Sequence, residues 1–146
     1  MMKIFGWIIF GFFSIAVGLY PVLYFVLDMS QGFLSSKSAE LLQNQVWYFF
    51  FYQHIIFGGI ALLIGWTQFS KKIRNKYLTL HRTLGKVYVV ACLLSGCAGF
   101  YIAFFATGGI IASVGFGCLA TAWLVTTLSA YMTIRKGQID AHQAWM

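Results

Sequence analysis

The stretch TLHRTLGKVYVVACLLSGCAGFYIAFFA, residues 79–106, decides the class of this protein. Its last twenty residues, 87–106, contain no Lys, Arg, Asp or Glu. An α-helix rises about 1.5 Å per residue, so this apolar part is long enough to cross the ~30 Å hydrocarbon core of a bilayer. The stretch therefore predicts a membrane-spanning helix that is preceded by a histidine and an arginine, His81 and Arg82.

The composition of the whole chain agrees with this class. Of its 146 residues, 60% are hydrophobic and 9% are charged, and the mean hydropathy is +0.80. A soluble domain needs more charge than this to cover its surface. We predict an all-α integral membrane protein with a single transmembrane domain over residues 1–146, built as an antiparallel bundle of four transmembrane helices. The predicted spans are about 4–27, 47–69, 87–106 and 109–134.

The basic residues predict the orientation of the spans. Of the ten Lys and Arg residues, nine lie in segments on one side of the predicted membrane, and only Lys37 lies on the other side. Cytoplasmic loops are enriched in Lys and Arg, so we expect both termini on the cytoplasmic side of a cytoplasmic membrane. Lipid headgroups and topology account for this charge. We therefore expect the lipid bilayer, and no nucleic acid, as a partner.

Small and polar residues repeat at helical spacing along one side of the second and third spans. Small side chains allow helices to approach closely in a membrane, where no hydrophobic force drives them together. We therefore expect these sides to face the inside of the protein. They carry His54, Gly58, Ala61, Gly65 and Gln68 in the second span, and His81, Gly85, Tyr88, Cys92, Gly96 and Gly99 in the third.

His54 lies inside the second span, where an unpaired polar side chain is costly. Two interpretations are open: hydrogen bonds to a serine, threonine or carbonyl of a neighbouring helix, or a role as a ligand or proton relay. His54 is fourteen residues from Gln68 at the inner edge of the span. This spacing corresponds to roughly 21 Å along a helix, so His54 cannot share a metal with His81 or His142 and would form a separate site.

His81 and His142 both belong to the predicted cytoplasmic face. Anchoring at the membrane interface is sufficient to explain Arg82, and a solvated tail would explain His142. Alternatively, the two imidazoles hold a haem, with Arg82 available for a propionate or an anionic headgroup. His81, His142 and Arg82 are thus the candidate cofactor-binding residues, and haem b is the first cofactor to test. The identity of any metal is left open.

Other chemistries lack the necessary residues. No predicted span contains an acidic residue, which removes the usual carboxylate of a proton-coupled transporter. The three acidic residues of the chain are too few for a plausible acid–base site, and no phosphate-binding glycine loop is present. The three cysteines form no C-x-x-C pattern and are expected to pack as small apolar residues. We name no catalytic residue and expect that the protein is not an enzyme.

Three motifs carry a family resemblance. They are H-R-x-x-G-x-x-Y over residues 81–88, a Gln-His pair at residues 53–54, and H-x-x-W-M over residues 142–146. From about Tyr48 onward, the chain resembles an uncharacterised family of bacterial predicted membrane proteins, a domain of unknown function. The resemblance implies the inner membrane of a bacterium, and the histidines at helix ends are similar to those of di-haem b-type membrane cytochromes by analogy. In proteins of this kind H-x-x-W-M opens a further span, so we expect that this sequence is a shortened member or a fragment, or that a partner supplies the helix.

Three functional hypotheses follow. The first is a small structural or assembly membrane protein that binds a partner subunit or forms a homo-oligomer. The second is a membrane redox protein associated with b-type haem or quinone. The third is a transporter of a small solute, for which four spans would require a homo-oligomer. Haem would give the purified protein a colour, which separates the second hypothesis from the others.

Overall fold

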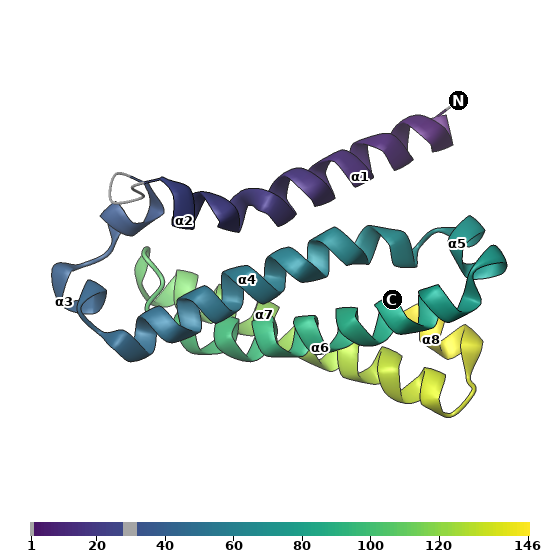
Figure 1. Cartoon of the computed structure of the whole chain (residues 1–146). Helices are drawn as coiled ribbons and strands as arrows, with labels where there is room; N and C mark the ends of the chain where they lie inside the picture. Colours follow the sequence, from purple (N-terminus) through teal and green to yellow (C-terminus); the bar gives the residue numbers. More distant parts are fainter. Residues whose placement is uncertain (1, 28–31) are drawn as a thin grey trace.

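The computed structural model describes residues 2–27 and 32–146, and these residues form helices joined by loops (Figure 1). The first span consists of α1 (Met2–Leu19), the 3₁₀ turn η1 (Tyr20–Val22) and α2 (Leu23–Val26). The remaining elements are η3 (Phe33–Ser36), α3 (Ala39–Leu42), α4 (Gln45–Gln68), α5 (Lys71–Lys76), α6 (Leu78–Ala103), α7 (Gly109–Arg135) and α8 (Ile139–Trp145).

The prediction of an all-α membrane protein with four spans is confirmed. Four helical segments are long and apolar enough to cross a membrane: Ile4–Val26, Gln45–Gln68, Leu78–Ala103 and Gly109–Arg135. The third helix begins at Leu78, well before the predicted start at Val87. The preceding residue, Tyr77, has non-helical dihedral angles (φ −131°, ψ 60°) and separates α5 from α6. His81 and Arg82 therefore lie within the helix itself, near its first turn.

The four long helices pack in a row. In sequence order, α1 packs against α4, α4 against α6, and α6 against α7. Figure 1 shows α1 lying along α4 on the side away from α6. Within the described residues, α1 makes no substantial contact with α7. The arrangement thus differs from a closed four-helix bundle, because only α4 and α6 have neighbouring spans on two sides.

The central pair, α4 and α6, meets through glycines on both helices. A Cβ atom added to Gly65 would lie 2.9 Å from the Tyr88 ring, and one added to Gly99 would lie 2.9 Å from His54 Nδ1. These contacts pair the end of one helix with the beginning of the other, so α4 and α6 run in opposite directions. The small-residue sides of the second and third spans are therefore the ones that meet, as their spacing predicts.

The contact between α1 and α4 is closer still. A Cβ on Gly59 would lie 2.7 Å from the carbonyl oxygen of Gly18, and 3.1 Å from Pro21 Cγ. Toward the other end, the rings of Trp7 and Trp66 pack with their centroids 6.2 Å apart. The first span is held to the second by a backbone-to-backbone approach that only glycine permits.

Glycines also shape the turns on both sides of α7. Gly108 and Gly109 have φ values of 119° and 71°, which lie in the left-handed region, and they join α6 to α7 in a tight turn. Gly137 has a φ of 74° and lies between α7 and α8. Because the chain reverses there, α8 packs back against α7. His142 on α8 is thereby brought beside the second half of α7.

Candidate functional site

His54 is hydrogen-bonded within the interface between α4 and α6. Its Nδ1 lies 3.0 Å from the carbonyl oxygen of Ser95 and 3.2 Å from Ser95 Oγ. The Ser95 hydroxyl donates to the carbonyl oxygen of His54 at 2.9 Å. Because the hydroxyl proton is used there, Nδ1 must carry the imidazole hydrogen.

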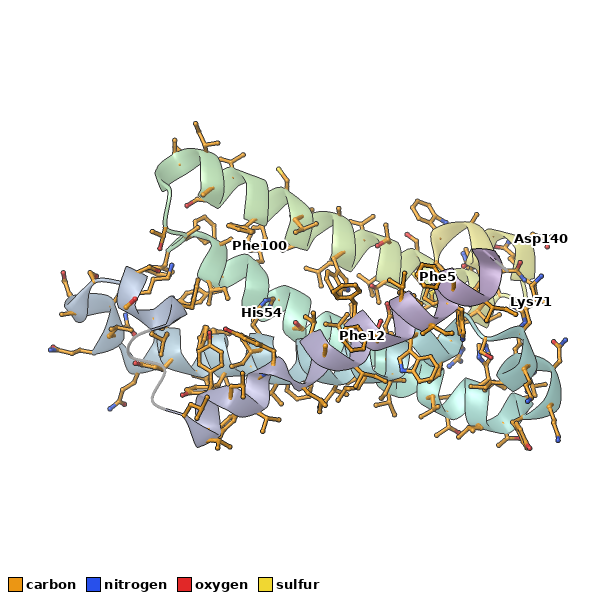
Figure 2. The ribbon with its side chains drawn as sticks, turned by 90° about the horizontal axis from the view of Figure 1, so that it is seen from above. Phe5, Phe12, His54, Lys71, Phe100 and Asp140 are labelled. Carbon is orange, nitrogen blue, oxygen red and sulfur yellow. The ribbon has the colours of Figure 1, made fainter. Side chains whose placement is uncertain are left out.

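The surroundings of His54 are those of a histidine that joins two helices. Gly99 has no side chain, which lets the imidazole lie directly against α6. The neighbouring Gln53 donates from Nε2 to the carbonyl oxygen of Leu94 at 3.1 Å. These contacts correspond to the hydrogen-bonded interpretation of His54, since its polar atoms pair with a neighbouring helix. Figure 2 shows His54 far from Lys71 and Asp140 along the length of the molecule.

His81 has a buried ring nitrogen. Its backbone N–H continues the helix by donating to the Tyr77 carbonyl oxygen at 3.0 Å. Its Nδ1 is buried and has no hydrogen-bond partner among the described residues. A buried polar atom left unpaired costs about 1–3 kcal/mol, so such atoms are normally satisfied by water, an ion or a ligand. His81 Nδ1 is thus a polar atom that the described part of the protein encloses without pairing it.

His142 is oriented by α7. Its Nδ1 lies 2.8 Å from the carbonyl oxygen of Ala130. A carbonyl oxygen only accepts, so Nδ1 carries a hydrogen, and in the neutral imidazole Nε2 then has the lone pair. Histidines that bind metals usually donate their other ring N–H to a carbonyl or carboxylate in this way, which fixes the tautomer and the orientation of the ring. The contact with Ala130 thus fixes the orientation of the His142 ring against α7.

The predicted candidates His81, Arg82 and His142 lie at the end of the molecule that carries α5 and α8, here called the α5 end. His81 is within electrostatic range of His142, Arg74 and Arg82. The Arg82 side chain is exposed. The structure therefore brings the two candidate ligands and two guanidinium groups to one end, and it leaves His54 apart, as the helical spacing predicts.

A groove of about 350 Å³ lies between α6, α7 and α8. Tyr88 on its wall follows His81 by two turns of α6, and Trp145 follows His142 by one turn of α8. Three aromatic rings and several aliphatic side chains line it, with few polar atoms, so a flat apolar group suits it. The lining residues are Tyr88, Leu119, Ala122, Trp123, Thr126, Thr127, Trp145 and Met146.

Two partners of the histidines were not predicted from the sequence. Ser95 lies between Cys92 and Gly99 on the predicted inner side of α6, so its position at helical spacing was a usable signal. The carbonyl of Ala130 has no sequence signal, because any residue there offers the same oxygen. Within residues 2–27 and 32–146, no three His, Cys, Asp or Glu side chains gather as potential metal ligands.

The fold and the site define a polytopic α-helical membrane protein with histidines at separate depths. Residues 51–146 match a protein family described as predicted membrane protein (DUF2306), a domain of unknown function, and the chain belongs to this family. The matched region runs from within α4 to the end of the chain and includes all three histidines. The family suggested by the three motifs is thereby confirmed. No curated protein and no solved structure matches the chain.

Proposed function

We propose that this protein binds haem b at the α5 end, with His81 and His142 as the iron ligands. The proposal rests on the hydrogen bonding of the two imidazole rings. His142 has its Nδ1–H committed to the Ala130 carbonyl at 2.8 Å and its Nε2 lone pair unused, while His81 has a buried nitrogen without a partner among the described residues. Iron is a group for which both nitrogens are suitable ligands.

The charged residues around the pair support an anionic cofactor. Arg74 and Arg82 lie within electrostatic range of His81. A guanidinium binds a carboxylate with two parallel hydrogen bonds, so these residues suit the propionate groups of a haem. The apolar groove beside Tyr88 and Trp145 would receive the edge of the macrocycle. In this role the protein carries electrons in the membrane and needs no catalytic residue of its own.

The proposal includes an orientation. The α5 end carries nine of the ten basic residues of the sequence, whereas Lys37 is at the opposite end, here called the α3 end. By the positive-inside rule, we place the α5 end, both termini and the haem on the cytoplasmic side of a bacterial inner membrane. Fusing a reporter that is active only in the cytoplasm to the C-terminus tests this orientation independently of any cofactor.

An absorbance spectrum tests the haem proposal directly. The protein is purified in mild detergent from cells with an adequate haem supply and measured oxidised and after reduction with dithionite, together with an iron determination. We expect a Soret band that shifts on reduction and close to one iron per chain. A colourless, iron-free preparation from the same cells would contradict the proposal.

A second function, assembly with another membrane helix, is favoured by the outer side of α7. A Cβ atom added to Gly115 would meet nothing within 4 Å, so the surface of α7 is open at this position. Cys118 follows three residues later on the same side of the helix and is exposed. Two small exposed residues one turn apart suit close helix packing with a second copy or a partner subunit.

Cys118 reports on this association without an added label. In a dimer with its two-fold axis along the membrane normal, equivalent residues lie at the same depth. If α7 pairs with itself, mild oxidation of a Cys97→Ser variant in membranes should give a disulfide-linked dimer, and a further Cys118→Ser change should remove it. A Cys97→Ser protein that stays monomeric under oxidation would speak against self-association through this side of α7.

A further inference from the structure

The α3 end of the molecule carries a second groove, with a volume of about 490 Å³. One wall is formed by residues 36–44, which lead from η3 through α3 into α4, and the other by residues 105–107, which follow α6. Hydrogen bonds connect the two walls: Lys37 Nζ donates to the Phe105 carbonyl oxygen at 2.7 Å, and the hydroxyls of Ser36 and Thr107 are 3.4 Å apart. The groove is thus a built part of the fold.

Of the groove-lining residues that the structure describes, Lys37 is the only cationic one. Its ammonium group lies 5.1 Å from the centre of the Phe33 ring, and its hydrogen bond goes to a carbonyl at the C-terminal end of α6, where a positive charge is favourable. The side chain is partly buried, and this burial lowers the pKa of Lys37. An ammonium group has three N–H donors. An anion in the groove would accept a hydrogen bond from one of the remaining N–H groups of Lys37. This bond would replace hydration that the ammonium group loses on burial.

Glu40 is the only anionic residue among the described residues that line the groove. It lies in the first turn of α3, and its side chain is exposed. The neighbouring Ser38 begins this helix by accepting the backbone N–H of Leu41 at 3.3 Å. With Lys37 and Glu40 on its lining, the groove presents one positive and one negative charge. A ligand that carries both charges on adjacent groups matches this arrangement better than a simple anion does.

The position of the groove indicates that such a ligand is a membrane lipid. Its walls adjoin the ends of α4, α6 and α7, three helices that are long and apolar enough to cross a membrane. We therefore expect the groove at the depth of the lipid headgroups. Large apolar side chains project beside it: Phe104 is 68% exposed, Ile110 79% and Ile111 84%. These side chains offer contacts for acyl chains directly beneath a polar binding site.

We propose that this groove binds an aminophospholipid of the phosphatidylethanolamine type. The lipid phosphate contacts the Lys37 ammonium, the ethanolamine ammonium faces Glu40, and the acyl chains run along Phe104 and Ile110. The site fixes one lipid at the junction between the α3 region and the α6–α7 turn. This assignment is independent of haem binding, because it lies at the opposite end of the molecule.

Lipid competition followed by native mass spectrometry tests the assignment. The full chain is delipidated in detergent and mixed with equal amounts of phosphatidylethanolamine and phosphatidylglycerol of the same acyl composition. We expect the protein to retain phosphatidylethanolamine about threefold over phosphatidylglycerol, the discrimination expected of a partly exposed charge pair. Glu40→Gln should remove this preference while lipid binding persists, and Lys37→Ala should reduce the retention of both lipids.

Two variants serve as comparisons in this lipid-binding experiment. Lys136→Ala removes a lysine at the α5 end and should leave the lipid ratio unchanged. Glu40→Gln alters no side-chain hydrogen bond that the structure assigns to Glu40, so it tests the charge without disturbing the fold. Equal retention of the two lipids by the unmodified protein, an unchanged ratio in Glu40→Gln, or full retention in Lys37→Ala would each overturn the proposal.

Discussion

The His142→Ala variant is expected to leave the purified protein without haem. On the proposed function, this substitution removes one of two iron ligands, and it also removes the hydrogen bond that links α8 to the Ala130 carbonyl. A single remaining imidazole does not hold a b-type haem in the low-spin, six-coordinate state that two histidines produce. The Soret absorbance and the iron content should both fall to background, and His81→Ala should give the same result.

Gln143→Ala is the matched control for this experiment. Gln143 is an exposed neighbour of His142 on the same short helix, so its truncation tests the effect of mutating α8 as such. It should retain the full spectrum. Haem added together with free imidazole to His142→Ala should restore part of the absorbance, because imidazole can occupy the space of the missing ligand. A His142→Ala protein with an undiminished spectrum would show that His142 does not ligate iron.

The Gly59→Ala variant is expected to weaken the docking of the first span. The added Cβ would lie 2.7 Å from the Gly18 carbonyl oxygen, which belongs to the backbone and cannot rotate away as a side chain would. The two helices must therefore separate, and overpacking of this kind typically costs about 1–3 kcal/mol. We expect a loss of this size in the free energy of unfolding, measured by titration with SDS in mixed micelles. The fluorescence of Trp7 and Trp66, which pack together across the same interface, should change as well.

Gly6→Ala provides the comparison. A Cβ on Gly6 would meet nothing within 4 Å, so this change alters helix propensity without steric conflict. The difference between the two variants isolates the cost of the close approach at Gly59. If Gly59→Ala unfolds at the same SDS fraction as Gly6→Ala, the tight contact between α1 and α4 does not hold the first span in place.

The four spans could be predicted from the sequence because length and apolar composition suffice to define a membrane helix. The order in which they pack could not. In a membrane the lipid-facing and protein-facing sides are both apolar, so polarity does not distinguish them. The glycine spacing did indicate which sides of α4 and α6 pack against each other. The contact between Gly18 and Gly59 could not be predicted, because it depends on the angle at which α1 and α4 cross. The predicted span begins at Val87 because the residues before it are basic, whereas the helix that contains this span begins at Leu78.

For the candidate site, the sequence was sufficient to separate His54 from His81 and His142, because the helical rise fixes their depths. The hydrogen-bond partners of each imidazole ring could not be predicted from the sequence. The bond from His142 to the Ala130 carbonyl exists because Gly137 reverses the chain, and the angle of that reversal is a property of the folded backbone. The buried Nδ1 of His81 likewise follows from the way the helices surround it.

The row of helices has a consequence for how the protein is made. Each membrane-spanning helix packs against the one synthesised just before it, from the first span through α4 and α6 to α7. A span that leaves the translocation machinery therefore finds its permanent neighbour already in the bilayer. Among the four described spans the order of synthesis is thus also the order of packing.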